Sequence, residues 1–532
     1  MSESPKKQNF LQGAALLAMS KAIVKVIGAL YKIPLKAIIG DQGFSYFNTA
    51  YALYSLLLMI ATAGLPVAMS RMISKYSSLQ QYGQLRRIFK TARALYLGLG
   101  TACTLLMILF CRELATFQGQ PNAVYALLCL APCALLMGIM STYRGFYQGQ
   151  GNMLPTSMSQ VMEAFIKLFV GLGAAYIILQ HTGSIPMAAG GAILGVTVSC
   201  LCSAIFLKAK FGKAYKQLPH TDEAVMTYGT AAKSLFAIAI PITIGSAGLQ
   251  LLTVLETHLY MGQLLSSGMT QDAADVTKGI YDFSLTIFNL PTAFIAPITI
   301  SVLPAVTAQL TLKTDTAVRS TEESAARVTG LLAAPCAVGL AVLAAPIMAL
   351  LGGYEGDSLE LASTLLTWLG AAVFLYSCIQ YTNALLQSHG YAHVPVINML
   401  LCGAVKLIVV YVLTGNPAIG ITGAPIGAVL GYSAIVVLNL IAIRKLVPQK
   451  PALLTNILKP VLPAAIMGVA VYGVYWVLVN MAHVTGAVLL CGIPIVAGVA
   501  VYAVTAVLTR AITREDCLLL PKGEKIARFL KL

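Results

Sequence analysis

Runs of about twenty apolar residues recur along the whole chain, and each is long enough to cross the hydrocarbon core of a bilayer as a helix. Of the 532 residues, 58% are hydrophobic and only 10% are charged, whereas soluble proteins carry about 25% charged residues. The apolar runs are continuous rather than alternating, which argues against a membrane barrel. The sequence therefore predicts an all-α integral membrane protein.

Hydropathy places about fourteen spans along the chain. They cover residues 10–39, 45–73, 91–110, 123–141, 155–179, 186–207, 234–264, 279–308, 328–352, 361–384, 394–414, 423–443, 460–480 and 486–509. The lysine-studded first run is too long for a cleaved signal peptide, so we expect it to be retained.

The distribution of charge predicts how the spans are oriented. If the amino terminus is cytoplasmic, the segments on that side contain Lys6, Lys7 and the cations of 75–93, 208–233, 313–327 and 444–459, together with a basic tail. The outer loops contain Arg112 and mostly acids, among them Asp41, Asp272, Asp275 and Glu360. The positive-inside rule then predicts that both termini are cytoplasmic. The net charge of +16 is explained by topology, so no nucleic-acid partner is expected.

Two segments of the chain repeat. The stretch YQGQGNMLPTSMSQVMEAFIKL at 147–168 aligns without a gap with LQSHGYAHVPVINMLLCGAVKL at 386–407, at an offset of 239 residues. A second anchor aligns GLPVAMS at 64–70 with VLPAVTA at 302–308, at an offset of 238. Six spans per repeat give both repeats the same orientation, as in transporters built from parallel repeats.

The repeat predicts two pseudo-symmetric six-helix lobes around a central cavity, followed by two C-terminal helices. The expected boundaries are 1–222 for the first lobe and 223–445 for the second. Residues 446–532 hold the last two spans and the basic cytoplasmic tail. A cavity between two lobes of one chain permits a monomer.

Lysines inside the first span are the most unusual feature of the chain. Ionisable residues within a bilayer are costly and usually face a cavity or a partner. At about 100° per residue, Lys21, Lys25, Lys32 and Lys36 lie within about 60° of one another around a straight helix. Pro34 is expected to kink the helix near its outer end. Snorkelling to the headgroups explains Lys36 well and Lys21 in part, so Lys25 and Lys32 are the strongest candidates for a cavity wall.

Other charged residues of the spans extend this set. Glu163 and Lys167 are four residues apart on one helical face, so they can pair and lower each other's cost of burial. Lys406 is the repeat partner of Lys167, but Cys402 stands where a glutamate would be needed for the same pairing. Lys406 could therefore contact Glu256, Asp282 or a bound anion. A purely structural salt bridge is the alternative. For Arg71, near the cytoplasmic end of its span, snorkelling competes evenly with a cavity role; Lys278 lies at the edge of a span.

Several chemistries find no support in the sequence. The eleven cysteines are scattered and read as small packing residues. His181, His389, His393 and His483 are single loop histidines without ligand spacing, so no metal is expected. No P-loop pattern and no paired loop carboxylates appear, so we expect neither nucleotide hydrolysis nor another catalytic site. An excess of cations in the spans suits an anionic substrate such as a diphosphate, which must cross the membrane. No bound cofactor is expected. The energy for transport would come from an ion gradient, the membrane potential or the downhill flux of the substrate.

Two motifs carry a family resemblance. GLPVAMSRMISKY at the end of the second span and YRGFYQGQGNMLPTSMSQVMEAFIKL before the fifth resemble the stage V sporulation protein B and polysaccharide-exporter branch of the multidrug/oligosaccharidyl-lipid/polysaccharide superfamily. The resemblance covers nearly all of the chain and implies a flippase for undecaprenyl-diphosphate-linked saccharides. Such flippases alternate between inward-open and outward-open states, and the lipid II flippases of cell-wall synthesis are related to them.

The resemblance also implies where the substrate binds. In the relatives, a cationic cavity built from the first, second and eighth spans receives the diphosphate-sugar head, and a groove by the last two spans takes the lipid tail. Carried over, this assigns Lys21, Lys25, Lys32, Arg71 and Lys278 to the cavity. The relatives favour arginine where this chain has lysines, and lysine gives up bidentate phosphate contacts. Glu256 stands where an aspartate is common, so it is assigned no cation site.

Three readings of the function follow. The favoured one is the lipid-linked saccharide flippase of a bacterial cytoplasmic membrane, with membrane lipids and cell-wall synthesis enzymes as partners. The second is a cation-coupled multidrug exporter of the same superfamily, which would more naturally carry acids in its cavity. The third, a membrane enzyme, lacks candidate catalytic residues. The sequence leaves the saccharide, a coupling Na⁺ or H⁺, and a vegetative or sporulation role open.

Overall fold

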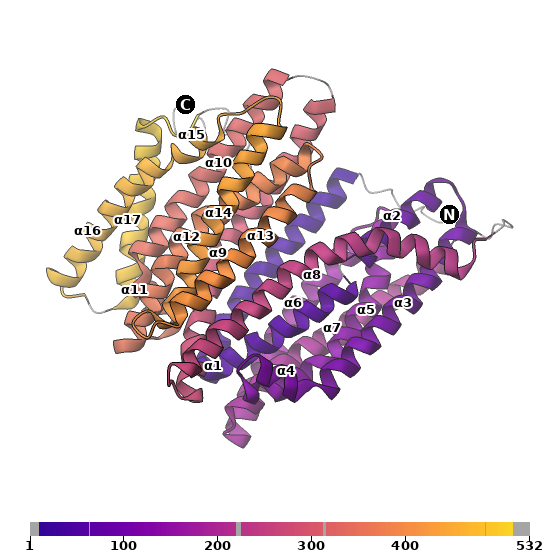
Figure 1. The fold of residues 1–532 in the computed structure, drawn as a ribbon, viewed down its shortest axis with the longest axis horizontal. Coiled ribbons are helices and arrows are strands. Elements are labelled where there is room, and N and C mark those ends of the chain that lie inside the picture. The colour runs from indigo at the N-terminus through magenta and orange to yellow at the C-terminus, as the bar shows by residue number, and fades with distance from the viewer. Residues whose placement is uncertain are drawn as a thin grey trace, which may run out of the picture. The chain divides into compact units, whose positions relative to one another are not determined.

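The computed structural model describes residues 10–62, 64–216, 218–219, 225–311, 315–484 and 486–513. Within these residues the chain is helical, with seventeen α-helices and two short 3-10 helices (Figure 1). Two compact units divide it at Gly279, within α9 (Gln271–Thr311). The expected basic tail beyond residue 513, and Lys6 and Lys7, lie outside the described residues.

The first unit is a helical bundle. It contains α1 (Phe10–Thr62), α2 (Leu65–Ser78), α3 (Tyr82–Leu109), α4 (Cys111–Phe117), η1 (Pro121–Ala123), α5 (Val124–Gly149), α6 (Leu154–Thr182), α7 (Ile185–Lys216), α8 (Tyr228–Ser266) and the beginning of α9. α7 packs between α5 and α6, and α8 packs on α1, α2 and α3. The unit therefore combines the six spans of the first repeat with the first span of the second.

The second unit contains the rest of α9 and the remaining helices. These are α10 (Asp315–Val342), α11 (Ala344–Gly352), α12 (Gly356–Ser388), α13 (His393–Thr414), η2 (Gly420–Thr422), α14 (Gly423–Leu446), α15 (Leu453–Leu458), α16 (Val461–Asn480) and α17 (Ala487–Leu508). α14 packs against α12 and α13, and α16 packs against α10 and α17 (Figure 1). The last two spans thus lie beside α10 rather than apart from the bundle.

Gly40, rather than Pro34, interrupts the first helix. Pro34 lies inside α1, and the non-helical dihedrals of α1 occur at Gly40, with φ 66° and ψ −177°. A positive φ is readily adopted by glycine because it has no Cβ. The break in α1 therefore lies at Gly40, residues 10–39 form one helical segment that presents its lysines on one face, and the kink expected at Pro34 stays a prediction.

The sequence repeat corresponds to two helical corners with matching boundaries. α5 ends at Gly149 and α6 begins at Leu154, while α12 ends at Ser388 and α13 begins at His393. Both boundaries are related by the offset of 239 residues. Each connecting turn contains a glycine with positive φ, Gly151 at 76° and Gly390 at 86°. The repeated motif therefore encodes the same helix-turn-helix corner twice.

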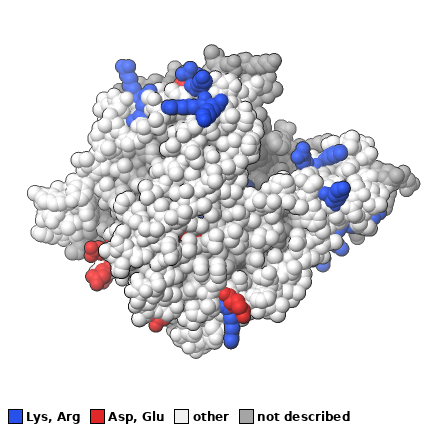
Figure 2. Space-filling model, viewed as in Figure 1, with Lys and Arg blue, Asp and Glu red and all other residues white. Residues whose placement is uncertain are grey.

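Long apolar helices and an apolar outer surface identify a multi-pass membrane protein. Twelve helical segments of the described residues are long and apolar enough to cross a membrane. One of them, Met19–Ser78, has 60 residues and contains two expected spans, separated at Gly40. Large side chains such as Phe169 (70% exposed) and Val496 (71%) point outward. In Figure 2 the charged side chains gather near helix ends, and the faces between them are uncharged.

Candidate functional site

The lysines of α1 form a graded series along one helical face. Lys21 and Lys25 are exposed, Lys32 is half-buried and Lys36 is buried. Lys25 lies about 21 Å along the helix from Ile39, near the middle of the span, at a rise of about 1.5 Å per residue. An exposed ammonium group within a span favours water or an anion over lipid.

Partners within α1 hold the two outer lysines. The Nζ of Lys32 donates to Oδ1 of Asn48 at 3.0 Å and lies 5.7 Å from the ring centroid of Phe44. Lys36 forms an ion pair with Asp41 across the break at Gly40, with 3.6 Å between Nζ and Oδ2. Snorkelling to the headgroups is therefore the wrong explanation for Lys36, because its ammonium group is buried against a carboxylate.

Arg144, rather than Lys167, makes the ion pair with Glu163. The Nη2 of Arg144 lies 3.0 Å from Oε2 of Glu163, and its Nε donates to Ser159 at 3.0 Å. The Nζ of Lys167 instead lies 5.6 Å from the ring centroid of Tyr31. The close ion pair of Glu163 is therefore made by Arg144 across the turn between α5 and α6, while Lys167 is attracted to Glu163 at longer range.

The remaining predicted cations are distributed over both units. Arg71 is exposed on α2, and Lys278 on α9 is buried with its Nζ 3.5 Å from the carbonyl oxygen of Ser45. Lys406 on α13 belongs to the second unit, where its Nζ lies 5.7 Å from the ring centroid of Tyr432. The first unit therefore holds six of the seven predicted cations: Lys21, Lys25, Lys32, Arg71, Lys167 and Lys278.

The predicted acids are also divided between the units. Glu163 and Glu256 lie in the first unit, the latter buried on α8, and Asp282 is half-buried at the start of the second. The pairing of Lys406 with Glu256 or Asp282 stays a prediction.

A buried polar cluster around Asp275, near the beginning of α9, escaped prediction. The carboxylate of Asp275 accepts hydrogen bonds from Tyr46 at 2.8 Å, Gln120 at 3.0 Å and Gln271 at 2.8 Å. Burial raises the pKa of Asp275, and these bonds and the charge of Lys278 partly oppose the shift. Asp275 was expected in an outer loop and instead lies fully buried in the first turns of α9. The only local sign of this burial in the sequence is Lys278, three residues later on the same helical face.

His389 was also misread from the sequence. Its Nε2 lies 2.7 Å from Oε1 of Glu322, a carboxylate that is completely buried on α10. The hydroxyl of Tyr381 donates to the backbone oxygen of Glu322 at 2.6 Å. His389 therefore anchors the end of α12 to α10 rather than lying in a free loop. Among the described residues, no group of three or more His, Cys, Asp or Glu side chains could hold a metal ion.

Comparisons with known proteins give a consistent family. Residues 10–309 match the model of the family described as polysaccharide biosynthesis protein. The chain is similar to three proteins of Bacillus subtilis. The uncharacterized membrane protein YabM is 27% identical over 98% of this chain and 96% of its own length. Lipid II flippase MurJ is 25% identical (88% and 89%), and stage V sporulation protein B is 25% identical (83% and 85%).

A solved structure has the same fold. Lipid II flippase MurJ in an inward closed conformation superposes with a TM-score of 0.70, over 93% of this chain and 99% of that one, at 14% identity. At that identity the match establishes the fold alone, which agrees with the expected arrangement of membrane helices.

Proposed function

Because this chain belongs to the polysaccharide biosynthesis protein family, we propose that it moves undecaprenyl-diphosphate-linked saccharides from the inner to the outer leaflet of a bacterial cytoplasmic membrane. Relatives named as a flippase and as a sporulation protein support a transport role rather than an enzymatic one. The cargo would be a lipid II-like precursor or a polysaccharide repeat unit.

The single observation that carries the proposal is the exposure of Lys25 in the middle of the first span. An ammonium group at this depth favours a water-filled cavity over lipid. Lys21 precedes it by one helical turn on the same face, so two exposed cations stand where a diphosphate could be bound. Charge-assisted hydrogen bonds from lysine to phosphate are roughly twice as strong as those between neutral groups.

The partners of the other lysines suggest a division of roles. Lys32 is oriented by Asn48, whose Oδ1 accepts a hydrogen bond from its Nζ. Lys36 is neutralised by Asp41, so we exclude it from the substrate site. Lys21, Lys25 and Lys32, joined by Arg71, Lys167, Lys278 and Lys406, would form the cationic wall of a cavity that opens alternately to each side of the membrane.

The decisive experiment compares two cargoes. Purified protein in liposomes is supplied with fluorescent lipid II or with a fluorescent drug cation, and transbilayer movement is followed by quenching from outside. Lipid II is expected to move and the drug is not. Movement of the drug alone would establish the competing function, a multidrug exporter.

Lys25→Ala links the activity to the site. It is expected to abolish flipping while the protein remains folded, as judged by its elution from a sizing column. Lys210→Ala, which removes an exposed charge at the end of α7, is the control and should flip lipid II normally. Normal flipping by Lys25→Ala would reduce the lysine series to a structural feature.

A further inference from the structure

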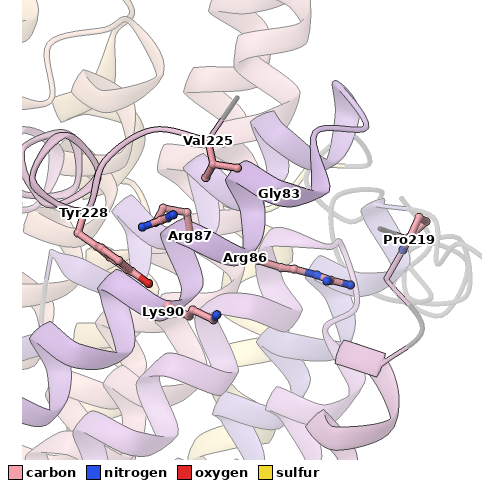
Figure 3. Close-up of a pocket in the computed structure, with 7 residues that line it drawn as sticks. All are labelled: Gly83, Arg86, Arg87, Lys90, Pro219, Val225 and Tyr228. Carbon is pink, nitrogen blue, oxygen red and sulfur yellow. The ribbon is translucent and has the colours of Figure 1, made fainter. Parts of the chain in front are cut away.

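A small cavity opens beside the beginning of α3, away from the lysines of α1. It encloses about 160 Å³ and is lined by the first turns of α3 and by residues on both sides of the chain segment that precedes α8. Three of its lining side chains, Arg86, Arg87 and Lys90, are cationic. Figure 3 shows Arg87 extending over Tyr228, and Arg86 extending toward Pro219.

Aromatic rings and a backbone oxygen fix the two arginines. The guanidinium carbon of Arg87 lies 3.9 Å from the ring centroid of Tyr228, and that of Arg86 lies 5.6 Å from the ring centroid of Tyr215. The Nη2 of Arg86 also donates to the carbonyl oxygen of Leu218 at 2.7 Å. Stacking on a ring leaves the edge of a guanidinium group available for hydrogen bonds to a planar or tetrahedral anion.

Electrostatics at this point call for a negative charge. Arg86, Arg87 and Lys90 lie within five residues of one another, in the second and third turns of α3, so their positive charges are concentrated at one point. The first turn of α3 contains no acidic residue, and its N-cap makes no side-chain capping bond. Within the described part of the chain, no salt bridge joins Arg87 or Lys90 to a carboxylate.

We propose that this cavity binds a phosphate group. Three cationic side chains around one cavity suit a phosphate group, because hydrogen bonds from Arg and Lys to phosphate oxygens are charge-assisted and strong. The group would come from the headgroup of an anionic phospholipid or from a soluble phosphate compound. The site is separate from the proposed transport cavity, and it does not depend on which cargo the protein moves.

Ligand-dependent thermal stability of the full-length protein tests the proposal, because a ligand that binds the folded state raises Tm. The protein in a neutral detergent is titrated with dihexanoyl phosphatidylglycerol, with dihexanoyl phosphatidylcholine and with inorganic phosphate, at constant ionic strength. Arg87→Gln/Lys90→Gln removes two of the three charges. The matched control, Lys75→Gln/Lys208→Gln, removes two exposed cations that do not line the cavity.

A saturable rise in Tm with phosphatidylglycerol or phosphate, about tenfold weaker in the cavity variant and unchanged in the control, supports the site. A response to phosphatidylglycerol alone identifies the lipid as the source, whereas a response to phosphate that competes with the lipid identifies the phosphate group itself. Equal responses of the wild type and both variants, or none in the wild type, would overturn the proposal. Arg87→Lys/Lys90→Arg, which keeps both charges, distinguishes lost binding from a damaged fold, because it should retain most of the response.

Discussion

The two repeated corners of the molecule have the same backbone arrangement but are held by different side-chain contacts. In the first corner, between α5 and α6, Arg144 forms an ion pair with Glu163. In the second, between α12 and α13, Asn383 stands at the position of Arg144 and Cys402 at that of Glu163. There the amide of Asn439 on α14 donates to Asn383 at 2.8 Å.

Both corners keep a lysine at the same position and in a similar setting. Lys167 lies 5.6 Å from the ring centroid of Tyr31, and Lys406 lies 5.7 Å from that of Tyr432. The charges of Arg144 and Glu163 cancel, so the compared residues of each corner carry a net formal charge of +1, that of the lysine. The comparison teaches that the lysine does not depend on a carboxylate one turn before it, since only the first corner has one.

The largest loss in the free energy of unfolding is expected from Arg144→Ala. It leaves the carboxylate of Glu163, one quarter exposed, without its ion-pair partner in an apolar unit. Breaking such a pair costs about 3 kcal/mol. Thermal or denaturant unfolding in detergent measures the loss. Asn383→Ala, the equivalent change in the second corner, should cost clearly less; equal losses would mean that the ion pair contributes no more than an amide.

Copying the second corner into the first should recover most of this loss. Arg144→Asn/Glu163→Cys removes both charges together and leaves no uncompensated carboxylate. We expect it to be about 2 kcal/mol more stable than Arg144→Asn alone. The same unfolding measurement applies, and a double variant no more stable than the single one would contradict the role assigned to pairing.

Asn439→Ala tests the amide network of the second corner. Its side chain donates to Thr382 at 2.9 Å and to Asn383 at 2.8 Å, and accepts from Asn398 at 2.9 Å. Hydrogen bonds between membrane helices average about 0.6 kcal/mol, so the loss of three should cost about 1.8 kcal/mol. The unfolding free energy gives the value; a change near zero would show that neighbouring amides replace the lost bonds.

Substituting the lysine of each corner tests whether Lys167 and Lys406 contribute to transport. Lys167→Gln and Lys406→Gln should each slow lipid II flipping about tenfold, equivalent to about 1.4 kcal/mol of lost interaction. Initial rates in liposomes provide the measurement. If only one of the two variants flips lipid II more slowly, only that lysine contributes to transport, and the two corners are not functionally equivalent.

The smallest effect is expected from Tyr432→Leu. The ring beneath Lys406 is half-buried, and a cation-π contact of this kind contributes about 0.5 to 1 kcal/mol. Tyr31→Leu should cost more, because Tyr31 is fully buried and its hydroxyl donates to Ala192 at 3.0 Å. Unfolding of the two variants side by side decides the order, and the reverse order would contradict this assignment.

Much of the fold could be predicted because helical periodicity is local. The apolar runs located the membrane helices, the offset of 239 residues located both corners, and the spacing of the lysines placed them on one face of α1. Residue motifs pointed to the family that the comparisons support. The short helices α4 and α15 were missed, because seven and six residues are too few for a periodic pattern.

The candidate site was predicted less completely, because pairing depends on neighbouring helices. Glu163 and Lys167 have the spacing of a helical pair, but the turn after α5 brings Arg144 to the carboxylate across nineteen residues. Asp275 has the composition of a loop acid, but α1 and η1 supply Tyr46 and Gln120 and bury it. A one-dimensional spacing cannot show which side chain a neighbouring helix contributes.

The sequence by itself determined that this is a membrane protein, that its helices repeat, and that its first span carries lysines on one face. These properties follow from hydropathy and from the 3.6-residue turn, which neighbouring residues set. Tertiary structure decided which of those lysines keep their charge exposed. Asp41 neutralises Lys36 because Gly40 breaks the helix between them, whereas Lys25 remains exposed in the middle of the span.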